Sequence, residues 1–220
     1  MCCPAGNARN LAARRNRAIG AESQEGQRVQ FQFGPTTIAV NIADSAALLA
    51  AVRARLTAGT GFALATINLD HLVKLQTSDA FRRAYAAQDL VVADGNPIVW
   101  LSRLAGRPVS LVPGSDMVLP LARVAAETGR GVALVGATDA ALQAAADRLM
   151  REVPGLVVVM RHAPAMGFDP EGDEAARILR ELAARGTGLC LIALGAPKQE
   201  AFAARGRQIA PGVGFASVGA

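Results

Sequence analysis

The first group of residues that could do chemistry lies at the end of the apolar run 62–67 and in the turn beyond it. Thr66, Asn68, Asp70 and His71 supply a hydroxyl, an amide, a carboxylate and an imidazole within six residues. That mixture suits hydrogen bonding to a sugar or a phosphate. No serine or cysteine arrangement for nucleophilic catalysis accompanies it, and the adjacent Asp70 and His71 lack metal-pair spacing. Capping of a following helix is an equally good interpretation of these residues.

A second group, Asp94, Gly95 and Asn96, directly follows the apolar run 90–93. A carboxylate at the tip of a buried strand, partly removed from water, could act as a general base, and we expect Gly95 and Asn96 beside it to contact substrate. The alternative is a turn aspartate that caps a helix beginning near Pro97.

Two further groups combine glycine with polar residues at expected strand-to-helix junctions. Gly136 opens the first, and its loop could turn backbone N–H groups toward a phosphate. Lys198, Gln199 and Glu200 follow Gly195 in the second. A cation and an amide at a helix amino terminus make an anion or sugar-hydroxyl site, and a purely structural turn would not require a lysine, which opposes the helix dipole. The chain has no G-x-G-x-x-G and no G-x-x-x-x-G-K-[ST] pattern, which disfavours dinucleotide oxidoreductases and P-loop enzymes.

Short apolar runs that alternate with longer amphipathic ones must position these groups. Buried strands are predicted at 62–67, 90–93, 132–135, 156–160, 189–194 and 215–218. Helices are predicted near 45–59, 78–87, 97–105, 116–128, 139–151, 173–185 and 198–207, with N-caps at Ser45, Ser78, Asp116 and Asp139. A hairpin of 29–33 and 36–42 precedes them. The pattern predicts an α/β, Rossmann-like fold with a mainly parallel sheet and helices on both faces. Such sheets bind ligands at the carboxyl ends of their strands, so the polar groups should meet at one edge.

Composition narrows the function classes. The chain has 220 residues, of which 51% are hydrophobic and only 4% aromatic, with Trp100 and Tyr85 the single examples of their types. So few rings argue against a base-stacking nucleic-acid platform, and no apolar run reaches the ~20 residues of a membrane span. Five arginines against two glutamates in the first 28 residues account for +3 of the net charge of +5. We therefore expect a disordered basic leader at 1–28 and a single domain at 29–220.

The three cysteines show neither disulfide arithmetic nor metal-ligand spacing. Cys190 lies inside an apolar run and is interpreted as a small core residue, whereas Cys2 and Cys3 stand near the amino terminus. His162 is interpreted as a loop histidine. This cysteine usage fits a reducing cytoplasm, and no bound metal is expected.

Taken in order, these groups resemble the WecG/TagA/CpsF family of bacterial glycosyltransferases (glycosyltransferase family 26). The resemblance covers roughly residues 36–220 and rests on four motifs, of which the last is the most specific: Thr66-Ile67-Asn68, Val92-Ala93-Asp94-Gly95, Gly114-Ser115-Asp116 and Gly195-Ala196-Pro197-Lys198-Gln199-Glu200. The form of the first two motifs looks closest to the exopolysaccharide branch typified by GumM.

The resemblance implies an inverting, metal-independent hexosyltransferase without a cofactor. It would move a sugar from a UDP-sugar to a polyprenyl-diphosphate-linked saccharide in exopolysaccharide or cell-surface polysaccharide biosynthesis. Asp94 would match the general base, and Thr66, Asn68 and Gln199 would match pocket residues. Lys198 and the helix amino termini would offset the charge of the departing UDP. A glucosyl-type transfer to a lipid-linked oligosaccharide is favoured over N-acetylmannosaminyl transfer to undecaprenyl-diphosphate-N-acetylglucosamine, and a non-catalytic scaffold is the alternative of another class.

The chain departs from the family pattern in three places. The segment 109–113 lacks an arginine that often meets the acceptor diphosphate, which suggests an accepting sugar farther from that group. Phe168 is the one ring where an aromatic pair is common. The chain stops at Val218-Gly219-Ala220, where the family continues into a membrane-associating tail, so a shortened chain is expected. The expected location is cytoplasmic and peripheral at the inner face of the membrane, with a possible homo-oligomer.

Overall fold

The structure is a computed structural model that describes residues 29–219. The expected leader at 1–28, including Cys2 and Cys3, lies outside the described residues. In chain order the strands are β1 Val29–Phe33, β2 Thr36–Val40, β3 Phe62–Ile67, β4 Leu90–Ala93, β5 Gly131–Gly136, β6 Val158–His162, β7 Thr187–Ala193 and β8 Gly214–Ser217. The helices are α2 Ser45–Ala58, α3 Leu69–Thr77, α4 Asp79–Ala86, α5 Asn96–Leu104, α6 Gly114–Glu127, α7 Asp139–Glu152, α8 Asp173–Ala184 and α9 Lys198–Ile209.

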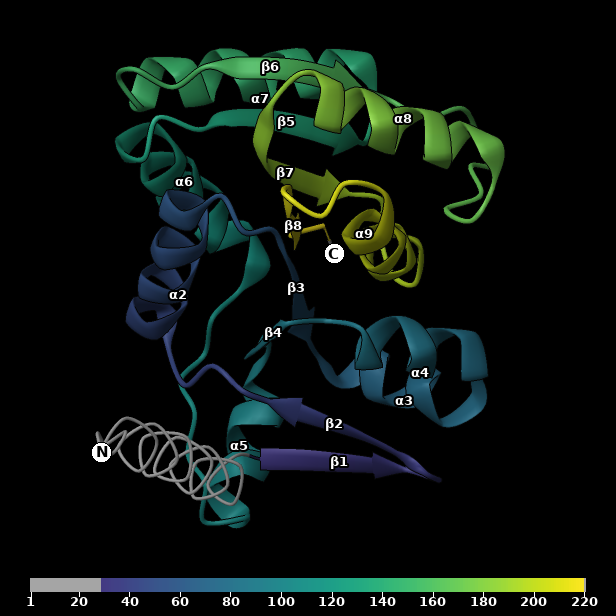
Figure 1. Ribbon diagram of the computed structural model, residues 1–220. Coiled ribbons are helices and arrows are strands. Elements are labelled where there is room, and N and C mark those ends of the chain that lie inside the picture. The colour runs from purple at the N-terminus through teal and green to yellow at the C-terminus, as the bar shows by residue number, and fades with distance from the viewer. Residues whose placement is uncertain (1–28, 220) are drawn as a thin grey trace, which may run out of the picture.

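Six strands form one parallel sheet in the order β4-β3-β8-β7-β5-β6, and β1 and β2 form a separate antiparallel hairpin. This confirms the predicted fold class. The chain moves from β3 outward to β4, crosses to the other half of the sheet at β5, and returns through β7 to the centre at β8 (Figure 1). We call the edge formed by the carboxyl ends of the six parallel strands the rim.

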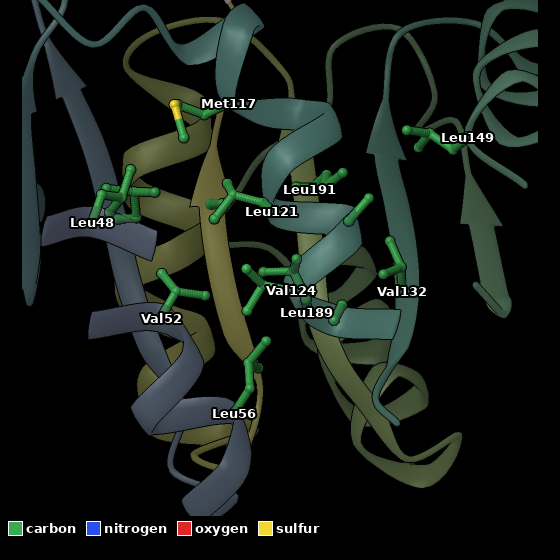
Figure 2. Packing of buried hydrophobic residues seen from close by; sticks show 14 of the residues in the cluster. Leu48, Val52, Leu56, Met117, Leu121, Val124, Val132, Leu149, Leu189 and Leu191 are labelled. Atoms are coloured by element: carbon green, nitrogen blue, oxygen red, sulfur yellow. The ribbon is translucent and has the colours of Figure 1, made fainter. Parts of the chain in front are cut away.

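Helices cover both faces of the sheet because successive side chains of each strand point to opposite faces. Leu64 of β3 belongs to the core shared with α2, α6 and α7, whereas its neighbour Ala65 belongs to the core under α3, α4, α5 and the hairpin. A third core lies under α8 and α9. Figure 1 shows α2 and α6 on one side of the sheet and α8 and α9 on the other. In Figure 2, Leu121 and Val124 of α6 lie among side chains of α2 and the sheet.

The helix starts correct several predicted N-caps. Ser78 caps α4 as predicted, since its hydroxyl accepts from the N–H of Phe81 at 3.1 Å. Asp44, Pro113 and Thr138 stand at the N-caps of α2, α6 and α7 instead of the predicted Ser45, Asp116 and Asp139. The cap needs an extended backbone just before the first turn, and the predicted residues already lie inside that turn. The separate short helix α3 was not predicted.

The two edge strands of the sheet, β4 and β6, are covered differently. Residues 41–42 run beside β4: the N–H groups of Asn41 and Ile42 both donate to the carbonyl of Val91 at 3.2 Å, and the Asn41 side chain accepts from the N–H of Val91 at 2.8 Å. Strand β6 has no strand on its outer side within residues 29–219, although Arg185 Nη1 donates to the carbonyl of Val159 at 3.1 Å. No helix in this described part of the chain is long and apolar enough to cross a membrane.

Candidate functional site

Asp94 stands at the rim, immediately after β4. Its backbone N–H donates to the carbonyl of Ile67 at 2.8 Å, which holds the residue against the tip of β3. Its Oδ2 accepts the N–H of Gly114, the first residue of α6, at 3.1 Å. Helix α5 has no side-chain cap, so the predicted alternative role as a cap near Pro97 is not formed. The carboxylate instead meets the positive end of α6, and Oδ1 forms no hydrogen bond within residues 29–219.

Thr66 and the segment after β8 close around the same helix start. A β-carbon placed on Gly114 would lie 3.2 Å from Cγ2 and 3.3 Å from Oγ1 of Thr66, and 3.2 Å from Cα of Val218. A side chain at position 114 would therefore need Thr66 or the backbone of Val218 to move by a few tenths of an ångström. We call Thr66, Asp94, Gly114 and Val218 the Asp94 cluster. It joins two predicted site residues, Thr66 and Asp94, that lie on neighbouring strands.

A groove of about 530 Å³ runs between α6 and α7 and reaches the rim beside this cluster. Ser115, Ala193 and Val218 line its rim end, and Val118, Leu119 and Leu149 are among the apolar side chains along it. A depression of about 540 Å³ beside β6 shares no residue with the Asp94 cluster. Of these two hollows, the α6–α7 groove is the one that shares a residue, Val218, with the Asp94 cluster.

Asn68 caps α3, because its Oδ1 accepts from the N–H of His71 at 2.9 Å. The alternative interpretation of this residue, helix capping, is thus confirmed. A β-carbon on Gly95, whose φ is 122°, would lie 3.9 Å from Cβ of Asn68, so the starts of α3 and α5 are neighbours. Asn96 is exposed at the first position of α5. A substrate role for these three residues remains a prediction.

Asp70 and His71 diverge from one another. The ring of His71 is only 4% exposed, and its Nδ1 lies 2.8 Å from the hydroxyl of Tyr85. It packs edge-on against Phe81 and Tyr85, and burial lowers the pKa of His71 to about 4, so the ring is neutral at pH 7. Asp70 is exposed and pairs with Lys74 at 2.5 Å. The structure does not bring either side chain into the Asp94 cluster.

Gly136 is required by a close approach between strands. Its φ is 121°, and a β-carbon there would lie 2.2 Å from the carbonyl oxygen of Ala193 at the tip of β7. The next N–H, of Ala137, donates to that carbonyl at 3.0 Å. This packing accounts for the glycine by itself, and the predicted phosphate contact stays a prediction.

The residues of the last motif lie at different depths. Lys198 is half-buried at the start of α9, whereas Gln199 and Glu200 are both 0% exposed. Gln199 Nε2 donates to Oε1 of Glu200 at 3.0 Å and to the carbonyl of Gly219 at 2.8 Å. Burial raises the pKa of Glu200 to about 7, although the bond from Gln199 and the charge of Lys74 act in the opposite direction. Direct contact of Glu200 with a substrate would need this packing to open.

Several residues of this region escaped the sequence analysis. Tyr85 was noted only as a single tyrosine, and Lys74 and Gln88 were not considered. Lys74 Nζ lies 3.4 Å from the carbonyl of Ala196, and Gln88 Nε2 donates to the carbonyl of Glu200 at 3.1 Å. If helix α3 had been predicted, the spacing of four residues between Asp70 and Lys74 would have indicated an ion pair on one helix face. The contact between Tyr85 and His71 had no such signal.

Three further residues named in the sequence analysis, Cys190, His162 and Phe168, have contacts that account for their positions in the fold. Cys190 is buried as predicted, and burial raises the pKa of its thiol. His162 ends β6 rather than lying in a loop, with Nε2 3.5 Å from Oε1 of Glu174. Phe168 is 5% exposed and lies against Phe202, with 5.9 Å between ring centroids, so this ring is not presented for base stacking.

The comparison with protein families gives one result over most of the chain. The model described as the glycosyl transferase WecG/TagA/CpsF family matches residues 35–220. The search of curated proteins gives no match.

Proposed function

Because this chain belongs to the WecG/TagA/CpsF family of glycosyltransferases, we propose that it transfers a hexosyl group from a UDP-sugar to a polyprenyl-diphosphate-linked saccharide. The observation that supports a particular catalytic site is the position of Asp94. Its carboxylate stands at the rim, is held at one oxygen by the amino terminus of α6, and adjoins the α6–α7 groove through Val218.

The proposed step is a direct displacement. Oδ1 of Asp94 takes the proton of the accepting hydroxyl while that oxygen attacks the anomeric carbon of the donor sugar. The bond from this carbon to the UDP oxygen breaks, UDP leaves with the electron pair, and the anomeric configuration inverts. The N–H of Gly114 holds Oδ2, which fixes the direction of Oδ1. Lys198 and the amino termini of α7 and α9 are the groups proposed to offset the charge of departing UDP.

The finer assignment follows from the sequence motifs. We propose the exopolysaccharide branch, with glucosyl-type transfer, from the form of the motifs at Asn68 and Asp94. We propose a lipid-linked oligosaccharide as acceptor because the segment 109–113 has no arginine for a nearby diphosphate. N-acetylmannosaminyl transfer to undecaprenyl-diphosphate-N-acetylglucosamine is the competing reaction. In either case the acceptor places the enzyme at the inner face of the cytoplasmic membrane, acting as one domain over residues 29–220.

The first experiment is thermal unfolding with UDP, UDP-glucose, UDP-N-acetylmannosamine or NAD. A ligand that binds the folded chain raises the melting temperature, so the response identifies the nucleotide class. We expect stabilisation by UDP or one UDP-sugar and none by NAD. Stabilisation by NAD alone would overturn the proposal.

The second experiment measures transfer with Asp94→Asn beside the matched control Asp147→Asn on the exposed face of α7. Asparagine retains an oxygen for the N–H of Gly114 but cannot accept the proton, so we expect turnover to fall by about 100-fold or more while UDP still stabilises the variant. Full turnover of Asp94→Asn would remove Asp94 from the role of base. A wild-type chain that associates with acceptor but never transfers sugar would favour the scaffold alternative.

A further inference from the structure

The first turn of α9 buries a pair of polar side chains that the proposed chemistry does not use directly. Both hydrogens of the Gln199 side-chain amide have acceptors, Oε1 of Glu200 at 3.0 Å and the carbonyl of Gly219 at 2.8 Å. Two acceptors on the same nitrogen assign the orientation of the amide without ambiguity, since the reversed group would turn its oxygen toward two other oxygens. Glu200 and the carbonyl of Gly219 together therefore fix the orientation of the Gln199 amide.

Gln199 in turn holds the segment that follows β8. A β-carbon on Gly219 would lie 2.8 Å from Cα of Ala193 and 3.0 Å from Oε1 of Gln199, so this backbone is tightly enclosed. The N–H groups of Val218 and Gly219 both donate to the carbonyl of Ile192, at 3.0 and 3.1 Å. Val218 also belongs to the Asp94 cluster, because its Cα lies 3.2 Å from where a β-carbon on Gly114 would stand. An unbroken series of contacts thus leads from Glu200 to the neighbourhood of the candidate base.

The surroundings of Glu200 show that its carboxyl is not merely filling space. Within residues 29–219, Oε2 has no hydrogen-bond partner although it is buried, an arrangement that lowers stability. An apolar side chain of similar length would fill the same volume without that cost. What a carboxyl adds is the acceptor for Gln199. Lys74 of α3 and Tyr85 of α4 are close enough for electrostatic interaction with Glu200, and Gln88 bonds its backbone carbonyl.

We propose that Glu200 is a positioning residue for the transfer reaction. Its carboxyl fixes the amide of Gln199, and this amide holds Gly219 and Val218 in the position that completes the Asp94 cluster. The reaction that it serves rests on the proposed function, whereas the contact between Glu200 and Gln199 can be tested without any substrate.

Three variants separate positioning from general packing. Glu200→Met removes the acceptor and keeps a side chain of similar length, and Glu200→Gln retains an oxygen that can accept from Gln199. Gln88→Met is the matched control, because it breaks a part-buried bond to the backbone of the same residue and leaves the Gln199 amide untouched. If only packing mattered, Gln88→Met would reproduce the effect of Glu200→Met.

The first measurement is hydrogen exchange of the Gln199 side-chain amide by NMR, with the signals assigned by their loss in Gln199→Met. We expect exchange to speed up by about tenfold or more in Glu200→Met, since one hydrogen bond is lost, and to change by less than about threefold in Glu200→Gln and Gln88→Met. Unchanged exchange in a folded Glu200→Met protein would overturn the proposal.

The second measurement is steady-state transfer. A shift of the site wall should lower kcat by about 10- to 100-fold in Glu200→Met with KM for the donor within about threefold, and Glu200→Gln should recover most of kcat. Equal losses in Glu200→Met and Gln88→Met would overturn the proposal. If Glu200→Met does not fold, Gln199→Met breaks the same contact from its other partner, and full kcat in that variant would also overturn it. If the wild type transfers no sugar, the proposed function fails, and amide exchange alone decides the positioning role.

Discussion

Replacing the buried Glu200 by glutamine should change how stability depends on pH. In the folded chain burial raises the pKa of Glu200 from 4.5 to about 7. Between these values the folded chain keeps a proton that the unfolded chain has released, so this carboxyl makes the free energy of unfolding fall as pH rises. The stabilisation is fully present below pH 4.5 and is lost as pH passes 7. The difference of about 2.5 units corresponds to roughly 3 kcal/mol.

His71, which lies near the same buried region, acts with the opposite sign. Burial lowers the pKa of His71 from 6.5 to about 4, so the unfolded chain binds the extra proton and this ring makes the free energy of unfolding rise with pH across that window. Its size is again roughly 3 kcal/mol. Between pH 4.5 and 6.5 the two contributions cancel in the wild type. Glu200→Gln removes one of them and leaves the other visible.

The assay is urea unfolding followed by far-UV circular dichroism at pH values from 4.5 to 8. The free energy of unfolding of Glu200→Gln minus that of the wild type should increase by up to about 3 kcal/mol over this range. Glu127→Gln, which removes an exposed carboxylate of α6 paired with Arg53, is the control and should not show this increase. A constant difference between Glu200→Gln and wild type across the range would refute the reasoning.

Three further substitutions test other features. Gly136→Ala should destabilise the chain by at least about 2 kcal/mol in urea unfolding, because its β-carbon would lie 2.2 Å from the carbonyl of Ala193 at a φ of 121°; a variant as stable as wild type would show that the strand tips can separate freely. Leu121→Ala should cost about 3 kcal/mol, since this fully buried side chain lies between α2 and the sheet (Figure 2), and a cost below about 1 kcal/mol would mean that the core closes over the cavity. Lys198→Ala should lower kcat by about tenfold or more if this cation offsets the charge of departing UDP, and an unchanged kcat would assign that role elsewhere.

The apolar runs of the sequence predicted the sheet and its rim well, because a strand that is buried on both faces appears as a short continuous run of apolar residues. Each of the six parallel strands coincides with a predicted apolar run to within about two residues at either end. Thr66 and Asp94 were placed correctly at one edge because neighbouring parallel strands end together. Helix α3 was missed because it follows β3 after a single residue, so its polar start reads as a turn.

The burial of individual side chains below the rim was harder to predict than the places along the rim where their segments lie. Lys198, Gln199 and Glu200 are consecutive and polar, which indicates an exposed helix start, yet α4 packs over α9 and buries two of the three. His71 was expected beside Asp70 in a polar cluster, but tertiary packing places its ring edge-on against Phe81 and Tyr85 of α4. Local sequence carries no information about a partner 14 residues away on another helix.

The unequal edges of the sheet have a consequence for self-association. An unpaired strand can add a strand of another molecule, which is the usual first step of ordered aggregation. Residues 41–42 hydrogen-bond to the backbone of Val91 on β4 and so prevent another strand from pairing at that edge. At β6 the blocking group is the guanidinium of Arg185, a flexible side chain that lies over the carbonyl of Val159 and is half exposed. A strand of another molecule would therefore pair at β6, and because the β4 side is blocked, pairing through two β6 edges would close as a dimer and would not grow into a polymer.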